Sequence, residues 1–253
     1  MRIGRDHGKL ASLSQDFFIE ALAGGEVAGM MTKALASCGQ LGGRRSPLHP
    51  RLVLWLVVSL MLWRSEAIPA VFGRLLSGLR ERWGKLSLKA VSESALAHAR
   101  RRLGVEPLRA FFRQLGAEVA PLPSFKDLKV WIIDGTRLTL QDTPANLKVF
   151  GRRKASRGRA AFCEIGMVCL VDATRRLIRD AVFGLWKLSE SKAAHRLIRH
   201  LASGDLVILD RLFHSLRLYK EIREREAHFL CRVSSKPTLK PIRGTRQGHQ
   251  YDA

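Results

Sequence analysis

The sequence predicts an α/β protein in which an all-α domain precedes a domain with a sheet. Up to about residue 122, apolar side chains recur at spacings of three and four residues, which is typical of amphipathic helices. The segment PLPSFK at 121–126 contains helix-breaking prolines, and after it short β-branched runs alternate with helical patterns. We therefore expect a helical domain over 1–122, an α/β domain over 126–234 and an exposed polar tail over 235–253.

The first domain is expected to be built from helices around an apolar core. Its most apolar run, LVLWLVVSLMLW, is shorter than the ~20 residues that a bilayer-spanning helix needs, so it predicts a buried core helix. The N-terminus lacks the apolar core of a signal peptide, and a cytoplasmic protein follows. Helices are predicted at 14–36, 52–63, 68–84 and, as a pair, within 91–119.

The pair of helices within 91–119 has clear end signals and a basic joint. Ser92 is a plausible N-cap, Gly104 breaks the first helix, and Pro107 suits the first turn of the second. The joint carries Arg100, Arg101 and Arg102. This arrangement is similar to a helix-turn-helix and predicts DNA contact through the arginines, whereas a solvated arginine cluster is the alternative.

The order of elements in the second domain predicts the arrangement of its sheet. Strands followed by a helix, a strand, a helix and a strand give the order of an RNase H-like fold that lacks its last helix. In such a sheet the first strand lies parallel to the strand after the first helix, and ligands bind at the carboxyl ends of the strands. Strands are predicted at 129–134, 136–141, 161–171, 176–186, 205–210 and 228–233, with helices at 190–202 and 215–226.

Two aspartates end apolar strand patterns in this domain. Asp134 closes WIID and Asp210 closes LVILD, so the predicted topology brings both to one edge of the sheet. Carboxylates that converge from different strands could hold Mg²⁺ or Mn²⁺. Taken alone, Asp134-Gly135 is also the pattern of a hairpin turn, and Asp210 could be a helix N-cap or pair with Arg211.

The net charge indicates the class of binding partner, and the spacing of the cysteines argues against a disulfide framework. The 253 residues contain 44 Lys and Arg against 22 Asp and Glu, a net charge of +22 that favours a nucleic-acid partner over a merely solubilising surface. No phosphate-binding loop, dinucleotide fingerprint or nucleophile elbow is present, so no small-molecule substrate is expected. The cysteines, which form neither a CxxC pair nor a disulfide framework, are Cys38, Cys163, Cys169 and Cys231.

Longer motifs resemble a known family. The segments WIIDGTRLTLQDTPANLKVFG and GDLVILDRLFHSLRLYKEIREREAHFLCRV resemble the two aspartate blocks of bacterial DDE transposases of the insertion-sequence-four group. The helical segments at 44–75 and 91–112 are similar to the N-terminal domain of that family, and the resemblance covers about 15–240. It implies that Asp134 and Asp210 are metal ligands and that Mg²⁺ or Mn²⁺ supports DNA cleavage and strand transfer by a 3′-hydroxyl. Glu190 matches a position at which the family has a recurring residue, and the role of that residue is left open.

The chain departs from the family pattern at two places. Leu212 stands where the family often has glycine, so the local turn is expected to differ. The family's third acid, a glutamate on a later helix, is not found before Ala253; Glu221, Glu224 and Glu226 come too early and are expected to be solvated. We therefore expect a truncated transposase with weakened catalysis, and a non-catalytic DNA-binding remnant or inhibitor is the alternative.

The resemblance also implies double-stranded DNA, as element ends and target, with a homodimer as one form of the complex. The protein would associate with the bacterial nucleoid and not with a membrane. A basic loop beside the predicted metal site could hold phosphates, and its alternative is a solvated loop. Its basic residues are Arg152, Arg153, Lys154, Arg157 and Arg159.

Overall fold

The computed structural model describes most of the chain, as two compact units. The described residues are 25–41, 47–83, 91–118, 121–155 and 158–233. One unit comprises residues 1–118 and the other 119–253. The predicted tail over 235–253, the first part of the predicted helix at 14–36 and Arg157 lie outside the described residues.

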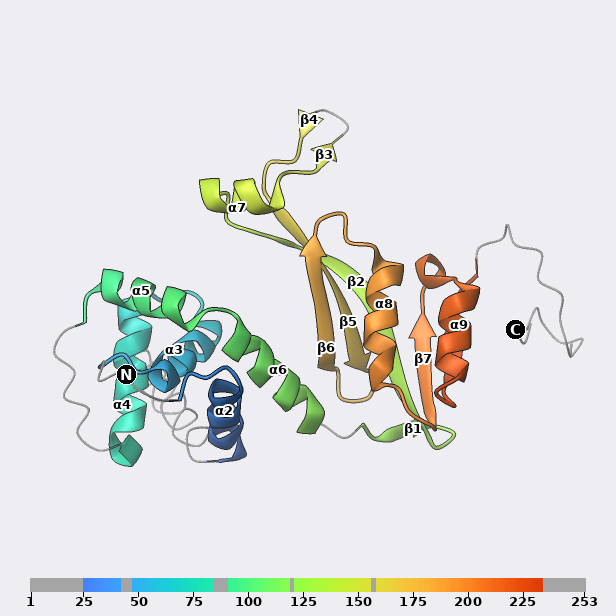
Figure 1. The fold of residues 1–253 in the computed structure, drawn as a ribbon, viewed down its shortest axis with the longest axis horizontal. Helices are drawn as coiled ribbons and strands as arrows, with labels where there is room; N and C mark the ends of the chain where they lie inside the picture. The colour runs from blue at the N-terminus through green and yellow to red at the C-terminus, as the bar shows by residue number, and fades with distance from the viewer. Residues whose placement is uncertain (1–24, 42–46, 84–90, 119–120, 156–157, 234–253) are drawn as a thin grey trace, which may run out of the picture. The chain divides into compact units, whose positions relative to one another are not determined.

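The first unit is helical (Figure 1). The helix predicted from the apolar run, α3, buries nearly its whole circumference, and Leu54, Trp55 and Leu56 are at most 1% exposed. Leu35, Leu75 and Leu96 of three other helices join the same core. The helices of this unit are α2 (Glu26–Ser37), α3 (Pro50–Leu62), α4 (Ile68–Trp83), α5 (Glu93–Leu103) and α6 (Glu106–Glu118).

The expected end signals of α5 and α6 are confirmed. The Ser92 hydroxyl accepts a hydrogen bond from the Ala95 N–H at 3.3 Å, which caps the first turn of α5. Gly104 ends α5 at φ +70°, a conformation that glycine adopts without steric cost, and Pro107 lies in the first turn of α6.

The second unit has one mixed sheet with the strand order β6-β5-β2-β7-β8, and β1 pairs with β2 at the side. β2 is central: it pairs antiparallel with β5 and parallel with β7, and β7 pairs parallel with β8. This is the order expected for the predicted fold. The strands are β1 (Pro123–Phe125), β2 (Leu128–Thr139), β5 (Glu164–Asp172), β6 (Leu177–Leu185), β7 (Asp205–Leu209) and β8 (His228–Cys231).

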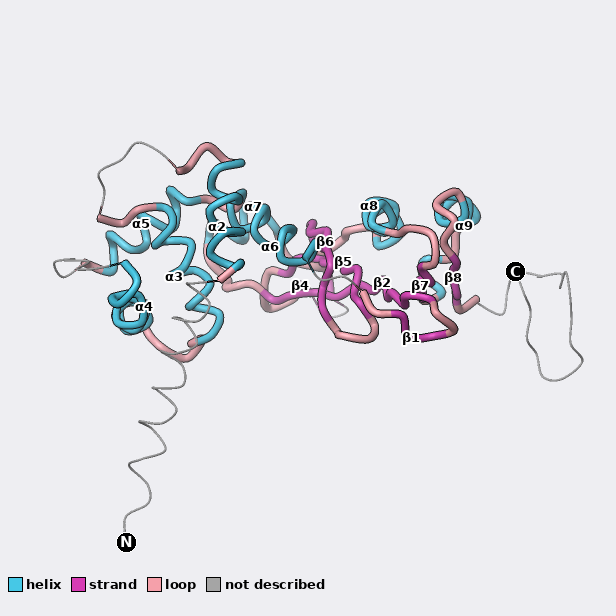
Figure 2. The backbone as a smooth tube through the Cα atoms, turned by 90° about the horizontal axis from the view of Figure 1, so that it is seen from below, coloured by secondary structure: helices cyan, strands magenta, loops and turns pink. Residues whose placement is uncertain are grey.

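Helices α8 (Glu190–Leu197) and α9 (Leu216–Arg223) lie on the same face of this sheet (Figures 1 and 2). A short 3-10 helix follows each of α8 and β7, namely Ile198–His200 and Arg211–Phe213. Trp131, Ile133 and Leu209 project from the strands into the core beneath the helices, as Leu197 and Ile222 do from the helices. Because side chains alternate along a strand, Val130 and Ile132 point to the other face of the sheet.

The two expected strands at 129–134 and 136–141 are a single strand, β2, so the hairpin interpretation of Asp134-Gly135 is wrong. β5 pairs with β2 without interruption from Trp131–Asp172 to Thr139–Glu164. That ladder satisfies the backbone on both sides of Gly135, and a turn would sacrifice several of its hydrogen bonds.

Beyond the end of β2 the chain forms a projecting segment, residues 142–163, which we call the arm (Figure 1). Thr143 caps a helix that was not predicted, because its hydroxyl accepts the Asn146 N–H at 3.2 Å and Pro144 occupies the first helical position. Thr143 is therefore the N-cap of this helix. The arm contains α7 (Pro144–Phe150), β3 (Lys154–Ala155) and β4 (Gly158–Arg159).

Candidate metal and nucleic-acid site

The register of the sheet brings Asp134 and Asp210 to adjacent positions. The last partners in the parallel pairing of β2 and β7 are Ile133 and Leu209, and each aspartate is the next residue of its strand's path. Neighbouring strands lie about 4.8 Å apart, so the two backbones present their carboxylates side by side at the carboxyl end of the β2–β7 pairing. This juxtaposition is the one that the predicted topology required.

Both carboxylates belong to the same face. Ile133 and Leu209 point into the core under α8 and α9, and the following residue of an extended chain points the opposite way. Asp210 keeps an extended backbone, with φ −78° and ψ 165°, so the alternation holds past the end of β7. Asp134 and Asp210 are both exposed.

Each aspartate binds its own backbone with one oxygen. Asp134 Oδ1 accepts the Gly135 N–H at 2.8 Å, and Asp210 Oδ1 accepts the Arg211 N–H at 2.6 Å. The capping interpretation of Asp210 is therefore correct, with a 3-10 helix in place of an α-helix. Neither forms an ion pair with another described residue, so each carboxylate keeps lone pairs for a cation.

The chemistry of this donor set suits a hard divalent cation. Carboxylate oxygens are the protein ligands that Mg²⁺ prefers, and Mg²⁺ needs only one or two of them because it retains several waters. Within the described residues no three His, Cys, Asp or Glu side chains converge around one point as a ligand group. Within the described residues, the candidate metal site thus contains two aspartates, Asp134 and Asp210, as possible direct ligands.

A third carboxylate lies close by, from the helix side of the sheet. A Cβ placed on Gly135 would be 2.6 Å from both Cδ and Oε1 of Glu190. Such a separation is shorter than any real contact, so the Glu190 carboxyl group occupies the space that a side chain at 135 would fill. Sequence reasoning left the role of Glu190 open, and no local pattern links residues so far apart.

Cys169 is the cross-strand partner of Asp134. Burial raises the pKa of its thiol, and the negative charges of Asp134 and Asp180 add to this effect. The thiol therefore stays protonated near neutral pH, and it is a poor metal ligand beside the aspartates.

The basic residues of the arm divide into two groups. Arg152 forms an ion pair with Asp142, and the hydrogen bond from Arg152 holds the pKa of the Asp142 carboxyl below its usual value. Arg153 lies 3.5 Å from Glu164 at the base of the arm. Lys154 and Arg159, in contrast, are exposed, and they are directly opposite each other in the β3–β4 pairing.

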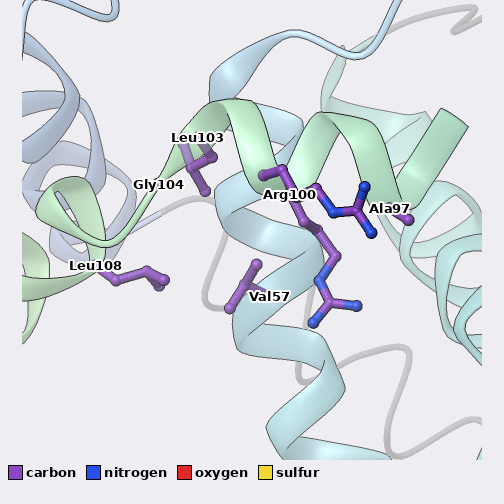
Figure 3. Close-up of a pocket in the computed structure, with 7 residues that line it drawn as sticks. Val57, Ala97, Arg100, Leu103, Gly104 and Leu108 are labelled. Atoms are coloured by element: carbon purple, nitrogen blue, oxygen red, sulfur yellow. The ribbon is translucent and has the colours of Figure 1, made fainter. Parts of the chain in front are cut away.

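The three predicted arginines of the first unit end α5. Arg100, Arg101 and Arg102 are all exposed in its last turn, where the helix dipole favours positive charge. Arg100 and Arg101 also border an open pocket of about 370 Å³ (Figure 3). The other lining residues come from α3, α5, α6 and their joint, namely Val57, Ala97, Leu103, Gly104 and Leu108.

One residue that was expected to be solvated, Glu221, has defined partners. Glu221, expected on a solvated surface, lies 2.6 Å from His195 Nδ1 and accepts from Arg217 Nε at 2.9 Å, so it joins α8 to α9. The hydrogen bond with His195, then that from Arg217, lowers the pKa of the Glu221 carboxyl. The pattern of the α9 surface does not reveal this contact, because His195 lies on another helix.

Comparison with known proteins gives the same division of the chain. Residues 21–113 match the family described as insertion element 4 transposase N-terminal, and residues 126–251 match the transposase DDE domain. The chain belongs to the insertion element 4 family of DDE transposases. The DDE-domain match includes both Asp134 and Asp210, and its RNase H-like fold is the fold of the second unit.

Two curated relatives come from Escherichia coli K12. Transposase InsG of insertion sequence element IS4 is 31% identical over 195 residues, which are 75% of this chain and 42% of InsG. The putative transposase InsZ is 26% identical over 187 residues, which are 72% of this chain and 60% of InsZ. This member of the family thus spans about half the length of the curated relatives it matches.

A solved piggyBac transposase synaptic complex with hairpin DNA aligns with 92% of this chain and 54% of that chain, at a TM-score of 0.41 and 12% identity. None of the helices that the structure describes is both long and apolar enough to cross a membrane.

Proposed function

We propose that this DDE transposase chain performs metal-dependent phosphoryl transfer on DNA, with Asp134 and Asp210 as the metal ligands. The observation that supports this most directly is their placement as the next pair after Ile133 and Leu209, on one face of the sheet. Mg²⁺ or Mn²⁺, when bound, would offset the negative charge of the phosphodiester and lower the pKa of a bound water.

The residues of the chain provide the frame for that chemistry. Asp134 is fixed by β2, which is held on both edges by β5 and β7, and Asp210 is fixed by its bond to the Arg211 N–H. A site on rigid strands keeps its ligands in place when substrate binds. The family reaction would then comprise cleavage at element ends and attack on target DNA by the freed 3′-hydroxyl.

DNA would be held mainly through phosphates. The net charge of +22 attracts a polyanion, and each phosphate contact releases counterions. Lys154 and Arg159 of the arm are the strongest candidates, because like charges directly opposite each other destabilise a strand pair unless an anion lies between them. Arg100, Arg101 and Arg102 would contact DNA from the first unit, and a homodimer on DNA in the cytoplasm would bring two element ends together.

We expect cleavage by this chain to be weak. Its described metal edge carries two aspartates, and the glutamate that completes the family's set is not matched by any described residue in that role. Retained DNA binding with little or no cleavage is therefore the second candidate function, that of a DNA-binding remnant or an inhibitor of a complete transposase.

The test is nicking of supercoiled plasmid that carries the DNA flanking this gene. In Mn²⁺ the wild-type chain is expected to nick slowly, and Asp134→Asn and Asp210→Asn to reduce nicking at least about 100-fold, since a mutated metal ligand costs that much or more. Asp127→Asn is the matched control, because Asp127 lies in the turn between β1 and β2 and its positive φ of 64° suits asparagine.

Three outcomes decide between the candidates. Nicking that needs both Asp134 and Asp210 supports the enzyme. Salt-sensitive DNA binding without nicking, unaffected by the two substitutions, supports the remnant. Nicking that survives both substitutions would mean that the proposed site is wrong.

A further inference from the structure

Glu190 occupies an unusual position for the first residue of a surface helix. Ser189 caps α8 by accepting the Lys192 N–H at 3.4 Å, so Glu190 begins the helix where its charge suits the helix dipole. An acid there normally points into water. Here the carboxyl group lies against Gly135 of β2 and is half-buried, without a hydrogen bond or ion pair to another described residue.

Space, rather than backbone conformation, accounts for the glycine at 135. Gly135 lies in the interior of β2, and its φ is not in the left-handed region that favours glycine. Glycine weakens a strand interior and often marks a close approach by another group. The group that approaches is the Glu190 carboxyl, 2.6 Å from the place of the missing Cβ.

Glu190 and Asp134 thus flank one residue. Asp134 Oδ1 lies 2.8 Å from the Gly135 N, and the Glu190 carboxyl adjoins the Cα of the same glycine. With the covalent geometry of Gly135, these contacts place the Glu190 Cδ within about 8 Å of Asp134 Oδ1. β7 ends at Leu209, so the edge of β2 that faces β7 has no strand partner beyond Ile133 within the described sheet.

We propose that Glu190 is a third carboxylate of the metal site, acting as a positioning residue. This inference rests on the proposed role of Asp134 and Asp210. Asp134 and Glu190 approach Gly135 from opposite faces, so Glu190 would contact a cation held by the aspartates through a bound water and not directly. Mg²⁺ and Mn²⁺ sites keep bound waters, and carboxylates that accept hydrogen bonds from them raise metal affinity.

The primary test is Mn²⁺ binding by calorimetry to the 253-residue chain without DNA. Glu190→Gln preserves the size of the side chain and is expected to weaken Mn²⁺ binding about tenfold, the lower range for an outer partner of a metal site. Glu224→Gln makes the same charge change on an exposed residue at the end of α9 and is expected to leave the affinity within twofold.

A second pair of variants separates positioning from structure. Gly135→Ala places a methyl group where the Glu190 carboxyl lies, so this flexible side chain must swing away, and the Mn²⁺ affinity is expected to fall while the melting temperature stays at or above that of wild type. Adding Glu190→Ala to Gly135→Ala removes the displaced carboxyl group and is expected to leave the affinity as low as in Gly135→Ala alone.

The outcomes distinguish this inference from the proposed function. If Asp134→Asn abolishes Mn²⁺ binding while Glu190→Gln matches wild type, Glu190 is no part of the site and only the further inference is wrong. If Asp134→Asn and Asp210→Asn bind Mn²⁺ like wild type, or if the wild-type chain does not bind Mn²⁺ at all, both proposals fail. Recovery of affinity in the double variant would also overturn the role of Glu190.

Discussion

Asp142 shows how one residue can organise a segment that has few other contacts. It receives the Arg152 guanidinium on one oxygen and the Cys163 thiol, at 3.4 Å, on the other. These partners come from the two sides of the arm, so the carboxylate ties its base together. Arg152, which is also predicted to contact DNA, stabilises the base of the arm through this ion pair.

The stability of the second unit should depend on pH through Asp142. The Arg152 hydrogen bond is the main cause that lowers the pKa of this carboxyl below its ordinary 3.8. A depressed folded-state pKa adds stability above the unfolded-state value, and that stability is lost as the pH falls through the folded-state pKa. Asp142→Asn should therefore be less stable than wild type at about pH 6, with a difference that shrinks below pH 3.8. Urea unfolding at a series of pH values measures this, and a constant difference would contradict it.

At the scale of elements, the arm and α5 carry the exposed basic groups that are predicted to contact DNA. α7 has no buried residue, and the arm extends beyond the paired part of β2 and β5. An element with so little core of its own is held by its base, namely by the pairs Arg152–Asp142 and Arg153–Glu164. Lys154 and Arg159 are exposed and can therefore contact a ligand such as DNA.

Replacing both Lys154 and Arg159 by alanine should weaken DNA binding and make it less sensitive to salt. Two lost phosphate contacts should reduce the slope of log K against log salt by about 1.8. Fluorescence anisotropy with a labelled duplex at several salt concentrations gives this slope.

The matched control is Arg223→Ala with Arg225→Ala. It removes the same charge from exposed residues at the end of α9, which runs away from the edge that carries Asp210. An equal change of slope in both double variants would mean that net charge alone, and not the arm, determines the binding.

At the scale of the whole molecule, the two units have separate cores. The cluster around Leu54 and Trp55 contains only residues of the first unit, and the cluster around Ile133 and Ile222 contains only residues of the second. Each core is closed by its own helices. The units can therefore lose stability one at a time, which small proteins with a single core cannot do.

Leu54→Ala should destabilise the first unit alone. Leu54 is fully buried, and such a truncation costs about 2–5 kcal/mol because a cavity remains. Hydrogen exchange followed by mass spectrometry should show faster exchange in α2 to α6 and unchanged exchange in β2, β5 and β7. Faster exchange in the sheet as well would mean that the two units unfold together.

The sequence by itself determined most of the order of the elements, the change from helix to sheet near residue 122 and the end of β7 before Asp210, but not α7 or the continuation of β2 through Asp134 to Thr139. These features depend on local periodicity and on which residues interrupt it, so they can be read from neighbours in the chain. The caps at Ser92 and Gly104 were predictable for the same reason.

Only the tertiary structure decided which contacts form between residues that are distant in the sequence. Asp134-Gly135 favours a turn in isolation, but pairing with β5 keeps it within a strand. Arg152 and Glu221 looked solvent-facing, yet Arg152 forms an ion pair with Asp142 and Glu221 forms a hydrogen bond with His195. The glycine at 135 has its explanation in Glu190, a residue on another element, because the space available to a side chain is set by what packs against it and not by its neighbours in sequence.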